Sequence, residues 1–378
     1  MSEGMKAAKI SVIIPISRQN SNLTTLLSLQ AKHASAVEFI LVIDNPTETF
    51  VAWVNNQIRQ SSCEAKVVVN ERNLGAAASR NTGLDHAVGD LIIFLDDDII
   101  PQHDLLDQHL KALDSDQYLG ALGFTKIPFD LNKIFERAID KTGFSYAYTM
   151  SQICPTHSWG PTCNLSIVRK YLTNESMRFD SIFPKEGGGE DVDLCWRLKQ
   201  TYQKAFKGLP AAKALHPPWE GIKGNYKRFN RWGKADVPLF LRHTTRRYRD
   251  FPNFMEFQLI LMFLLVPLLF WFQWGQILLF FGTQLLLAFG LCSLHEAFVL
   301  KTNPVTAAVA LSTVLSHELG RIEALFRMGR PWFLFTRTLY FDKDYPWRTR
   351  KRSLGNFLMS LLACFISGMC WLGGGIFG

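Results

Sequence analysis

Three consecutive aspartates, Asp96, Asp97 and Asp98, follow directly on the apolar run Leu91–Leu95. A short apolar run bounded by glycine and proline predicts a strand that is buried on both faces of a parallel sheet. Alternate residues of an extended chain point the same way, so Asp96 and Asp98 present two carboxylates on one side. Such hard oxygen ligands suit Mg²⁺ or Mn²⁺ shared with phosphate oxygens. The alternative is an acidic loop that only caps the next helix.

A second acidic pair, Glu190 and Asp191, follows three glycines and begins a predicted helix. The dipole at a helix N-terminus stabilises carboxylates and favours the ionised form that a general base requires. Taken alone, the pair fits ordinary helix capping by acids better than catalysis. His216 follows the next predicted strand and offers an imidazole nitrogen, which suits Mn²⁺ more than Mg²⁺. A structural loop histidine is an equal alternative to this third metal ligand.

The chain before the three aspartates predicts the scaffold that positions them. Strands alternate with helices in a β-α-β-α-β order, which is typical of a doubly wound parallel sheet. The predicted elements are a strand over residues 10–16 with Pro15 at its end, a helix from Ser21 or Asn22 whose apolar face is Leu23, Leu26, Leu27 and Leu29, a strand over 38–44, a helix over 50–61 and a strand over 66–69. Gly75 then opens a helix in which Arg80 can reach toward a phosphate.

Charge and apolar residues are unevenly distributed along the chain. Of its 378 residues 48% are hydrophobic, but the long apolar runs begin only after Phe251. The net charge of +8 concentrates in residues 223–249 and 321–352, which flank those runs. Basic clusters beside apolar helices indicate the cytoplasmic face of a membrane and its anionic lipids rather than nucleic acid. The 7 cysteines form no CxxC pair, and the first apolar run is too short for a signal peptide.

Three apolar segments predict membrane spans, namely residues 254–274, 276–294 and 354–377. The uncharged connection between the first two predicts a tight hairpin. Basic clusters at 242–249 and 343–352 precede the first and third spans, and the positive-inside rule places both in the cytoplasm. The hairpin supplies the even number of crossings that this arrangement requires. Another crossing within residues 304–327 would break the pattern, so this segment is predicted to be a membrane-surface or bundle-packed helix.

The order of these motifs resembles that of the inverting family-2 glycosyltransferases of the GT-A fold, in particular their membrane-bound branch. The resemblance covers residues 10–235. The motifs that carry it are Val12-Ile13-Ile14-Pro15, Asp44 at a strand end, Asn73-x-Gly75-x-x-x-Ser79-Arg80-Asn81-x-Gly83, Leu95-Asp96-Asp97-Asp98, Gly160-Pro161-Thr162-Cys163-Asn164-Leu165-Ser166 as the acceptor-side strand, Gly189-Glu190-Asp191, and Arg228-Phe229-Asn230-Arg231-Trp232 for (Gln/Arg)-x-x-Arg-Trp. One departure is that the family usually carries Asp-Asp where this chain has Ile43-Asp44.

The resemblance implies transfer of a hexose from a nucleotide diphosphate sugar, with UDP as the family's default nucleotide. The roles that it implies are Pro15 and Asp44 on the nucleoside, Arg80 near the diphosphate, Asp98 and Asp96 on Mg²⁺ or Mn²⁺ with Asp96 also near the ribose, and Asp191 as general base with Glu190 beside it. It further implies a phosphate clamp from Arg231 and a ring against the acceptor from Trp232. The alternative for this last pair is an amphipathic helix on lipid headgroups, and both can hold.

Together these patterns predict three regions. Residues 1–222 form a cytosolic GT-A domain, 223–253 a basic interfacial segment, and 254–378 a membrane domain with about three transmembrane helices and an interfacial helix. The predicted location is the cell (inner) membrane, with several passes and the catalytic domain in the cytoplasm.

The favoured acceptor is a lipid or lipid-linked hydroxyl, because three spans are few for a channel that passes a glycan. A processive polysaccharide synthase is the alternative. A protein of another class, a non-catalytic membrane tether that binds nucleotide sugars, has no need of a base. No GxGxxG follows the first strand, which argues against a dehydrogenase-type nucleotide domain.

Overall fold

The computed structural model describes residues 8–20, 22–61, 63, 65–219, 221–270, 272–341 and 345–376. Predicted features that fall on Ser21, Lys343 and Phe377 therefore lie outside the described residues. Backbone contacts group the chain into two compact units. The α/β unit contains Met1–Pro128 and Ser145–Pro218, and the helical unit contains Phe129–Phe144 and Trp219–Gly378.

The α/β unit is built on a mixed, mostly parallel sheet in the order β3-β2-β1-β4-β8-β6-β9-β5, with β7 paired to β9. Strands β3, β2, β1 and β4 run parallel, as do β6 and β9, whereas β8 is antiparallel to both of its neighbours. The strands are β1 Lys9–Ile16, β2 Ala36–Ile43, β3 Ala65–Val69, β4 Leu91–Leu95, β5 Ile100–Pro101, β6 Tyr118–Lys126, β7 Thr156–His157, β8 Asn164–Val168 and β9 Ala205–Leu215. The helices are α1 Leu23–Leu27, α2 Glu48–Ser61, α3 Ala76–His86, α4 Leu105–Leu110, α6 Tyr146–Thr149 and α7 Glu190–Tyr202, with short 3₁₀ turns Met150–Gln152 and Arg169–Tyr171. The predicted α/β class is confirmed.

Both faces of the central strands are covered, which explains their continuous apolar sequences. Val12 and Ile14 of β1 belong to a core that also contains buried side chains of α1, α2 and α4. Ile13 points the other way, toward Gly83 of α3, and Phe94 of β4 meets the edge of Phe179 with ring centroids 5.3 Å apart. Every residue of β4 is buried, as its sequence predicts for a strand enclosed on both sides.

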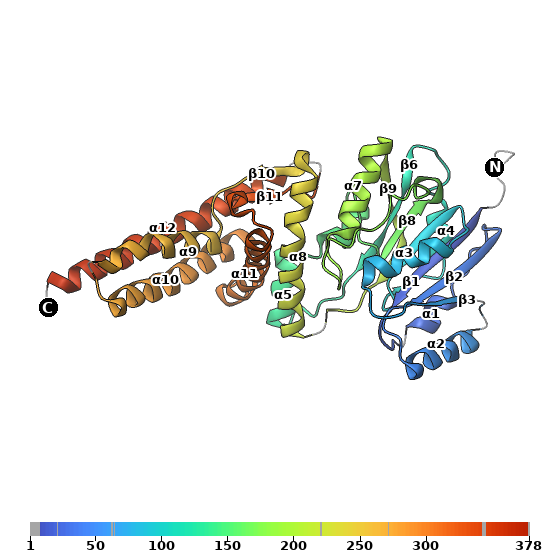
Figure 1. Ribbon diagram of the computed structural model, residues 1–378, viewed down its shortest axis with the longest axis horizontal. Coiled ribbons are helices and arrows are strands. Elements are labelled where there is room, and N and C mark those ends of the chain that lie inside the picture. The colour runs from blue at the N-terminus through green and yellow to red at the C-terminus, as the bar shows by residue number, and fades with distance from the viewer. Residues whose placement is uncertain are drawn as a thin grey trace. The chain divides into compact units, whose positions relative to one another are not determined.

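The helical unit consists almost entirely of helices, and its longest ones lie alongside each other. Helix α10 packs against α11 and α12, and α12 also contacts α9 (Figure 1). Its elements are α5 Ile134–Thr142, α8 Ile222–Arg242, α9 Phe254–Leu265, α10 Trp274–Leu300, α11 Pro304–Arg327 and α12 Tyr345–Ile376, the strands β10 Arg247–Arg249 and β11 Thr336–Thr338, and the 3₁₀ turns Thr244–Arg246, Val266–Phe270 and Pro331–Phe333. The helix predicted over residues 304–327 is confirmed, and it is packed within this bundle.

Among the described residues, two helices are long and apolar enough to cross a membrane, Trp274–Leu300 and Lys351–Trp371. Of the three predicted membrane spans, the first, over residues 254–274, is wrong. Helix α9 ends at Leu265 and gives way to a 3₁₀ turn that contains Pro267, so the apolar helix there is short. Proline lacks an N–H and its ring clashes with the carbonyl four residues earlier, which breaks the helix. The predicted hairpin connection is also displaced, because α10 already begins at Trp274.

The predicted interfacial segment 223–253 begins with a helix that is packed rather than merely lying on a surface. Helix α8 crosses α11 where Gly233 and Gly320 bring the two backbones together. A Cβ at Gly320 would lie 1.9 Å from the carbonyl oxygen of Asn230, so only glycine permits this approach. Farther along α8, Val237 and Phe240 are completely buried.

A buried ion cluster ties several elements of the helical unit together. Glu256 of α9 is inaccessible to solvent, and its carboxylate pairs with Arg321 of α11 and Arg337 of β11, each at 2.7 Å. The backbone N–H of Phe335 donates to the same carboxylate at 3.0 Å. Because a buried charge left unpaired is strongly destabilising, this cluster fixes the relative positions of these elements.

Candidate active site

Three predicted metal ligands converge at the carboxyl end of β4. One ligand atom each from Asp96, Asp98 and His216 lies within 4.8 Å of the other two. The two aspartates follow β4 directly, and His216 follows β9, which the sheet brings to the same edge. The structure thus brings together side chains that are 118 residues apart (from Asp98 to His216) in the chain.

The imidazole of His216 is held in the tautomer that a metal ligand needs. Its Nδ1 lies 2.7 Å from the carbonyl oxygen of Pro217, which can only accept a hydrogen bond, so Nδ1 carries the proton. Nε2 therefore presents a lone pair, 3.6 Å from Oδ1 of Asp98. That oxygen is buried and accepts no hydrogen bond from the part of the chain that the structure describes. Two carboxylates, one of which has an unsatisfied buried oxygen, and an imidazole nitrogen that faces them fit a divalent cation.

The carboxylates crowd one another. Burial raises the pKa of Asp97 to about 8, and the charges of Asp98 and Asp96 add to the effect. Burial likewise raises the pKa of Asp98, and the charge of Asp96 adds to the effect, while His216, when protonated, and Arg18 act in the opposite direction. The thiol of Cys163 lies close enough that, after burial, the charge of Asp96 raises its pKa further. Additional positive charge at this edge therefore stabilises the folded protein.

Arg80 supplies part of that charge from within the protein. Its side chain is only 7% exposed, and its guanidinium donates to Glu190 Oε1 at 3.0 Å and to Asp96 Oδ1 at 3.1 Å. The sequence placed Arg80 beside a diphosphate, whereas the structure shows it joining the aspartate loop to the start of α7. Its predicted contact with the donor stays a prediction.

Glu190 and Asp191 begin α7, as the sequence predicts, and the side chain of Asp191 remains partly exposed. Glu190 is buried and engaged with Arg80 and with the backbone N–H of Gly188. Burial and then the charge of Glu190 raise the pKa of Asp191 to about 7, although Arg80 and the N–H of Val192 act in the opposite direction. The helix end favours the ionised form of this carboxyl, as the sequence predicts, and burial acts against it.

Asp44 lies at the end of β2, where the sequence placed it, but its carboxylate is occupied by the protein. Oδ1 accepts from Asn70 Nδ2 at 2.9 Å and from Leu74 N at 2.8 Å, and Oδ2 accepts from Gly75 N at 2.9 Å. Gly75 has a φ of 96°, which only glycine adopts readily, and a Cβ there would meet the carbonyl oxygen of Lys185 at 2.4 Å. Asp44 thus shapes the turn into α3.

Two further predicted site residues occupy different settings. Pro15 is the next-to-last residue of β1 and is partly buried. Trp232 lies on α8 of the helical unit, where its ring meets those of Trp219, Phe229 and Phe144 with centroids 5.4 to 5.9 Å apart. Its neighbour Arg231 lies on the same helix. The roles of Pro15, Arg231 and Trp232 in substrate binding stay predictions.

Sequence reasoning missed His109, which anchors the strand after the Gly160–Cys163 stretch. The predicted acceptor-side strand begins only at Asn164, as β8. His109 donates from Nε2 to Asn164 Oδ1 at 2.8 Å and accepts at Nδ1 from Ser166 Oγ at 2.9 Å. Burial lowers the pKa of His109 to about 4, so it is neutral and structural. A lone histidine on a short helix gave no signal of this contact.

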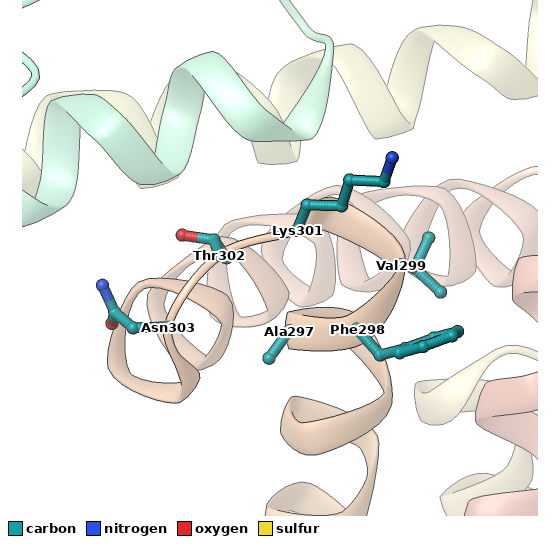
Figure 2. A pocket seen from close by; sticks show the side chains of 6 residues that line it. All are labelled: Ala297, Phe298, Val299, Lys301, Thr302 and Asn303. Atoms are coloured by element: carbon teal, nitrogen blue, oxygen red, sulfur yellow. The ribbon is translucent and has the colours of Figure 1, made fainter.

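An open pocket occurs elsewhere, at the turn between α10 and α11. Figure 2 shows its lining, which is Ala297, Phe298, Val299, Lys301, Thr302 and Asn303. None of the predicted site residues lines it. The chemistry of the candidate site is carried by the carboxylate edge of the α/β unit.

Part of the chain is similar to a known protein family. Residues 11–175 match the family model described as Glycosyl transferase family 2. The match includes the aspartate triplet but ends before Glu190, Asp191 and His216.

Several curated proteins are similar to the chain at modest identity. A pre-mycofactocin glycosyltransferase of Mycobacterium tuberculosis is 25% identical over 238 residues, which are 62% of this chain and 48% of the relative. The glycosyltransferase YfnE of Bacillus subtilis is 30% identical over 234 residues, 61% of this chain and 55% of the relative. The amylovoran biosynthesis glycosyltransferase AmsB of Erwinia amylovora is 33% identical over 112 residues, 29% of this chain and 37% of the relative. The chain spans about half the length of the first two of these relatives.

Two solved structures are also similar to the chain. The mannosyltransferase PcManGT from Pyrobaculum calidifontis, in complex with GDP-Man and Mn²⁺, has a TM-score of 0.46 and 14% identity, covering 96% of this chain and 88% of its own. GalNAc-T7 with UDP, GalNAc and Mn²⁺ has a TM-score of 0.43 and 13% identity, covering 58% of this chain and 44% of its own. At TM-scores this low the likenesses carry no functional argument.

Proposed function

We propose that the chain is a metal-dependent inverting glycosyltransferase that moves a sugar from a nucleotide diphosphate sugar, with UDP as nucleotide, to a hydroxyl of a membrane-associated lipid or lipid-linked acceptor. The observation that carries this proposal is the convergence of Asp96, Asp98 and His216 at the end of β4. The two aspartates lie within the residues that match the family model, and His216 lies beyond them. A divalent Mg²⁺ or Mn²⁺ bound there supplies the positive charge that stabilises a diphosphate leaving group.

The protein's own groups account for the remaining steps. The carboxylate of Asp191 takes the proton of the acceptor hydroxyl as its oxygen attacks the anomeric carbon. The bond from that carbon to the diphosphate oxygen breaks, and the electron pair leaves with the nucleoside diphosphate. Attack from the face opposite the leaving group inverts the anomeric centre. Glu190 and Arg80 hold the start of α7 beside the aspartate loop, so that base and leaving group are positioned together.

The raised pKa of Asp191 favours catalysis over the alternative of a non-catalytic membrane tether that binds nucleotide sugars. A general base works best when its pKa lies near the operating pH, and Asp191 has a value of about 7. A binding module gains nothing from a partly exposed carboxylate in this state.

Two long apolar helices of the helical unit support the membrane location. Helix α10 and residues Lys351–Trp371 of α12 can each cross a bilayer by length and composition. Large apolar side chains such as Phe298 and Leu286 of α10 are 84% and 77% exposed, which suits contact with lipid. We place the α/β unit in the cytoplasm, at the inner membrane, because the basic residues flank these helices. Two such helices among the described residues are too few to enclose a glycan channel, so a lipid-linked acceptor is favoured over a processive polysaccharide synthase.

The test is a transfer assay with the purified full chain in detergent. We would incubate it with a panel of radiolabelled UDP- and GDP-sugars, Mn²⁺ and a membrane lipid extract, and then extract the product into organic solvent. Radiolabel in the organic phase with one donor, lost in Asp98→Asn and Asp191→Asn, is the expected result. If the chain binds a donor but transfers no sugar, the non-catalytic membrane tether is favoured. If the product stays in the aqueous phase and grows in length, the processive polysaccharide synthase is favoured.

A further inference from the structure

The loop between β1 and α1 places Arg18 beside the candidate metal site. The sequence analysis did not single out this arginine. Arg18 Nη2 lies 3.1 Å from Asp98 Oδ2, while the other oxygen of Asp98 faces His216. Asn22 donates from its side-chain amide to the backbone carbonyl of Asp98 at 2.8 Å, which holds this loop beside the aspartates. Arg18 and Asp98 are 80 positions apart in the chain, so only the fold brings them together.

Arg18 differs from the other arginine at this edge. The side chain of Arg80 is 7% exposed and bridges two carboxylates on separate elements, so it is fixed. The side chain of Arg18 is 57% exposed, and the contact described for it is the single pair with Asp98. An exposed ion pair typically changes an equilibrium constant by only about fivefold or less. Arg18 can therefore leave Asp98 at little cost.

A divalent cation and Arg18 compete for the same carboxylate. A metal ion on Asp96, Asp98 and His216 uses the negative charge that Arg18 now neutralises, and it repels the guanidinium at short range. The planar fork of a guanidinium matches phosphate oxygens as well as it matches a carboxylate. Once displaced, Arg18 finds its next strong anion in the diphosphate that the same metal ion holds.

We propose that Arg18 is the displaceable cation of the donor site, pairing with Asp98 while the metal is absent and binding the diphosphate of the nucleotide sugar once the metal is bound. This inference rests on the proposed function, because it requires a metal–diphosphate donor. It assigns to Arg18 a role in ordering the steps: metal binding releases the side chain that the donor then uses.

The proposal predicts effects of opposite sign, which a merely structural role does not. Without Arg18, metal binding in the absence of nucleotide tightens, because a competitor and a repelling charge are gone. Nucleotide binding in the presence of metal weakens, because a charge-assisted contact is gone. A residue that only supports the loop weakens both when it is replaced.

The experiment measures binding alone, with the purified full chain in detergent and no acceptor. Mn²⁺ binding is followed by the EPR signal of the free ion, and UDP and GDP are then titrated by calorimetry at saturating Mn²⁺. For Arg18→Gln we expect Mn²⁺ to bind about three- to tenfold more tightly and the nucleoside diphosphate about tenfold or more weakly. Arg18→Lys keeps the charge, so Mn²⁺ binding stays near wild type while nucleotide binding falls in part.

Arg59→Gln, which removes an exposed arginine from α2, is the matched control and should change neither affinity. Equal affinities for wild type and Arg18→Gln, or losses of both, overturn the role of Arg18 and leave the proposed function standing. Absence of Mn²⁺ and nucleotide binding in the wild type overturns the proposed function, and the inference with it.

Discussion

The ionisation of Asp191 should control the rate of transfer near neutral pH. Its folded-state pKa is raised to about 7 by burial and by the charge of Glu190. A base must be ionised to accept a proton, so activity is full above that value and falls below it. A carboxyl of pKa about 7 is about nine-tenths ionised at pH 8 and about one-hundredth ionised at pH 5. We therefore expect the rate to fall about ninetyfold over this range.

An Asp191 carboxyl with an ordinary pKa would give a different dependence of rate on pH. A carboxyl with the ordinary aspartate value remains more than about nine-tenths ionised at pH 5, and the rate would then hardly change. The assay is initial-rate transfer at saturating donor, acceptor and Mn²⁺ from pH 5 to pH 8. Donor binding is measured in parallel, because protonation of the metal ligands would weaken it. A level rate profile, or a loss of rate that matches a loss of donor binding, would remove Asp191 from the role of base.

Two variants sharpen this test. Glu190→Gln removes the second cause of the raised pKa, so the acid limb of the profile should move to lower pH. Asp191→Asn should lose about 10²–10⁴ of the rate and show no acid limb. The linkage to stability has a definite sign: since folded Asp191 has the higher pKa, its ionisation opposes folding as the pH rises from about 4 to about 7. Asp191→Asn should therefore unfold at a higher temperature than wild type at pH 8, and this difference should vanish below about pH 4.

Three further predictions address the metal, the helix packing and the basic motif. Asp98→Asn should abolish the dependence of donor binding on Mn²⁺, and EDTA should stop transfer by the wild type; full activity in EDTA would refute the metal assignment. Gly320→Ala should lower the free energy of unfolding by about 2–4 kcal/mol, and with it the unfolding temperature, because the new Cβ would lie 1.9 Å from a backbone oxygen. Gly282→Ala is the control: nothing lies within 4 Å of its Cβ position, so this variant should be neutral or stabilising. Arg231→Lys should reduce transfer about ten- to a hundredfold if a planar fork is needed there, and wild-type transfer would leave Arg231 as a lipid contact.

Local sequence determined most of the elements. The apolar run before the aspartates makes β4, the glycines before Glu190 end a loop and start α7, and Pro304 opens a helix where it was predicted. These features depend on backbone preferences and on side-chain periodicity within a few residues, which a sequence states directly. The first predicted span contains Pro267, and the α-helix there already ends at Leu265.

Contacts between distant segments were decided only by the tertiary structure. The sequence gives no reason for residues 129–144 to belong with the helices that begin near residue 219. It also does not show that β8 enters the sheet antiparallel between β4 and β6. Such pairings depend on which surfaces are left to be covered once the local elements exist.

The same division holds for the candidate site. Residue type and spacing singled out Asp96 and Asp98, whereas Asp191 came from the resemblance to a known family. For His216 the sequence left a metal ligand and a structural loop histidine equally open. The sequence did not predict which side chains contact these residues. For example, Arg80 pairs with the carboxylate of Glu190, which is 110 residues away in the chain. Likewise, the direction of a histidine lone pair and the pKa of a carboxyl depend on burial and on neighbouring charges, which are properties of three-dimensional surroundings.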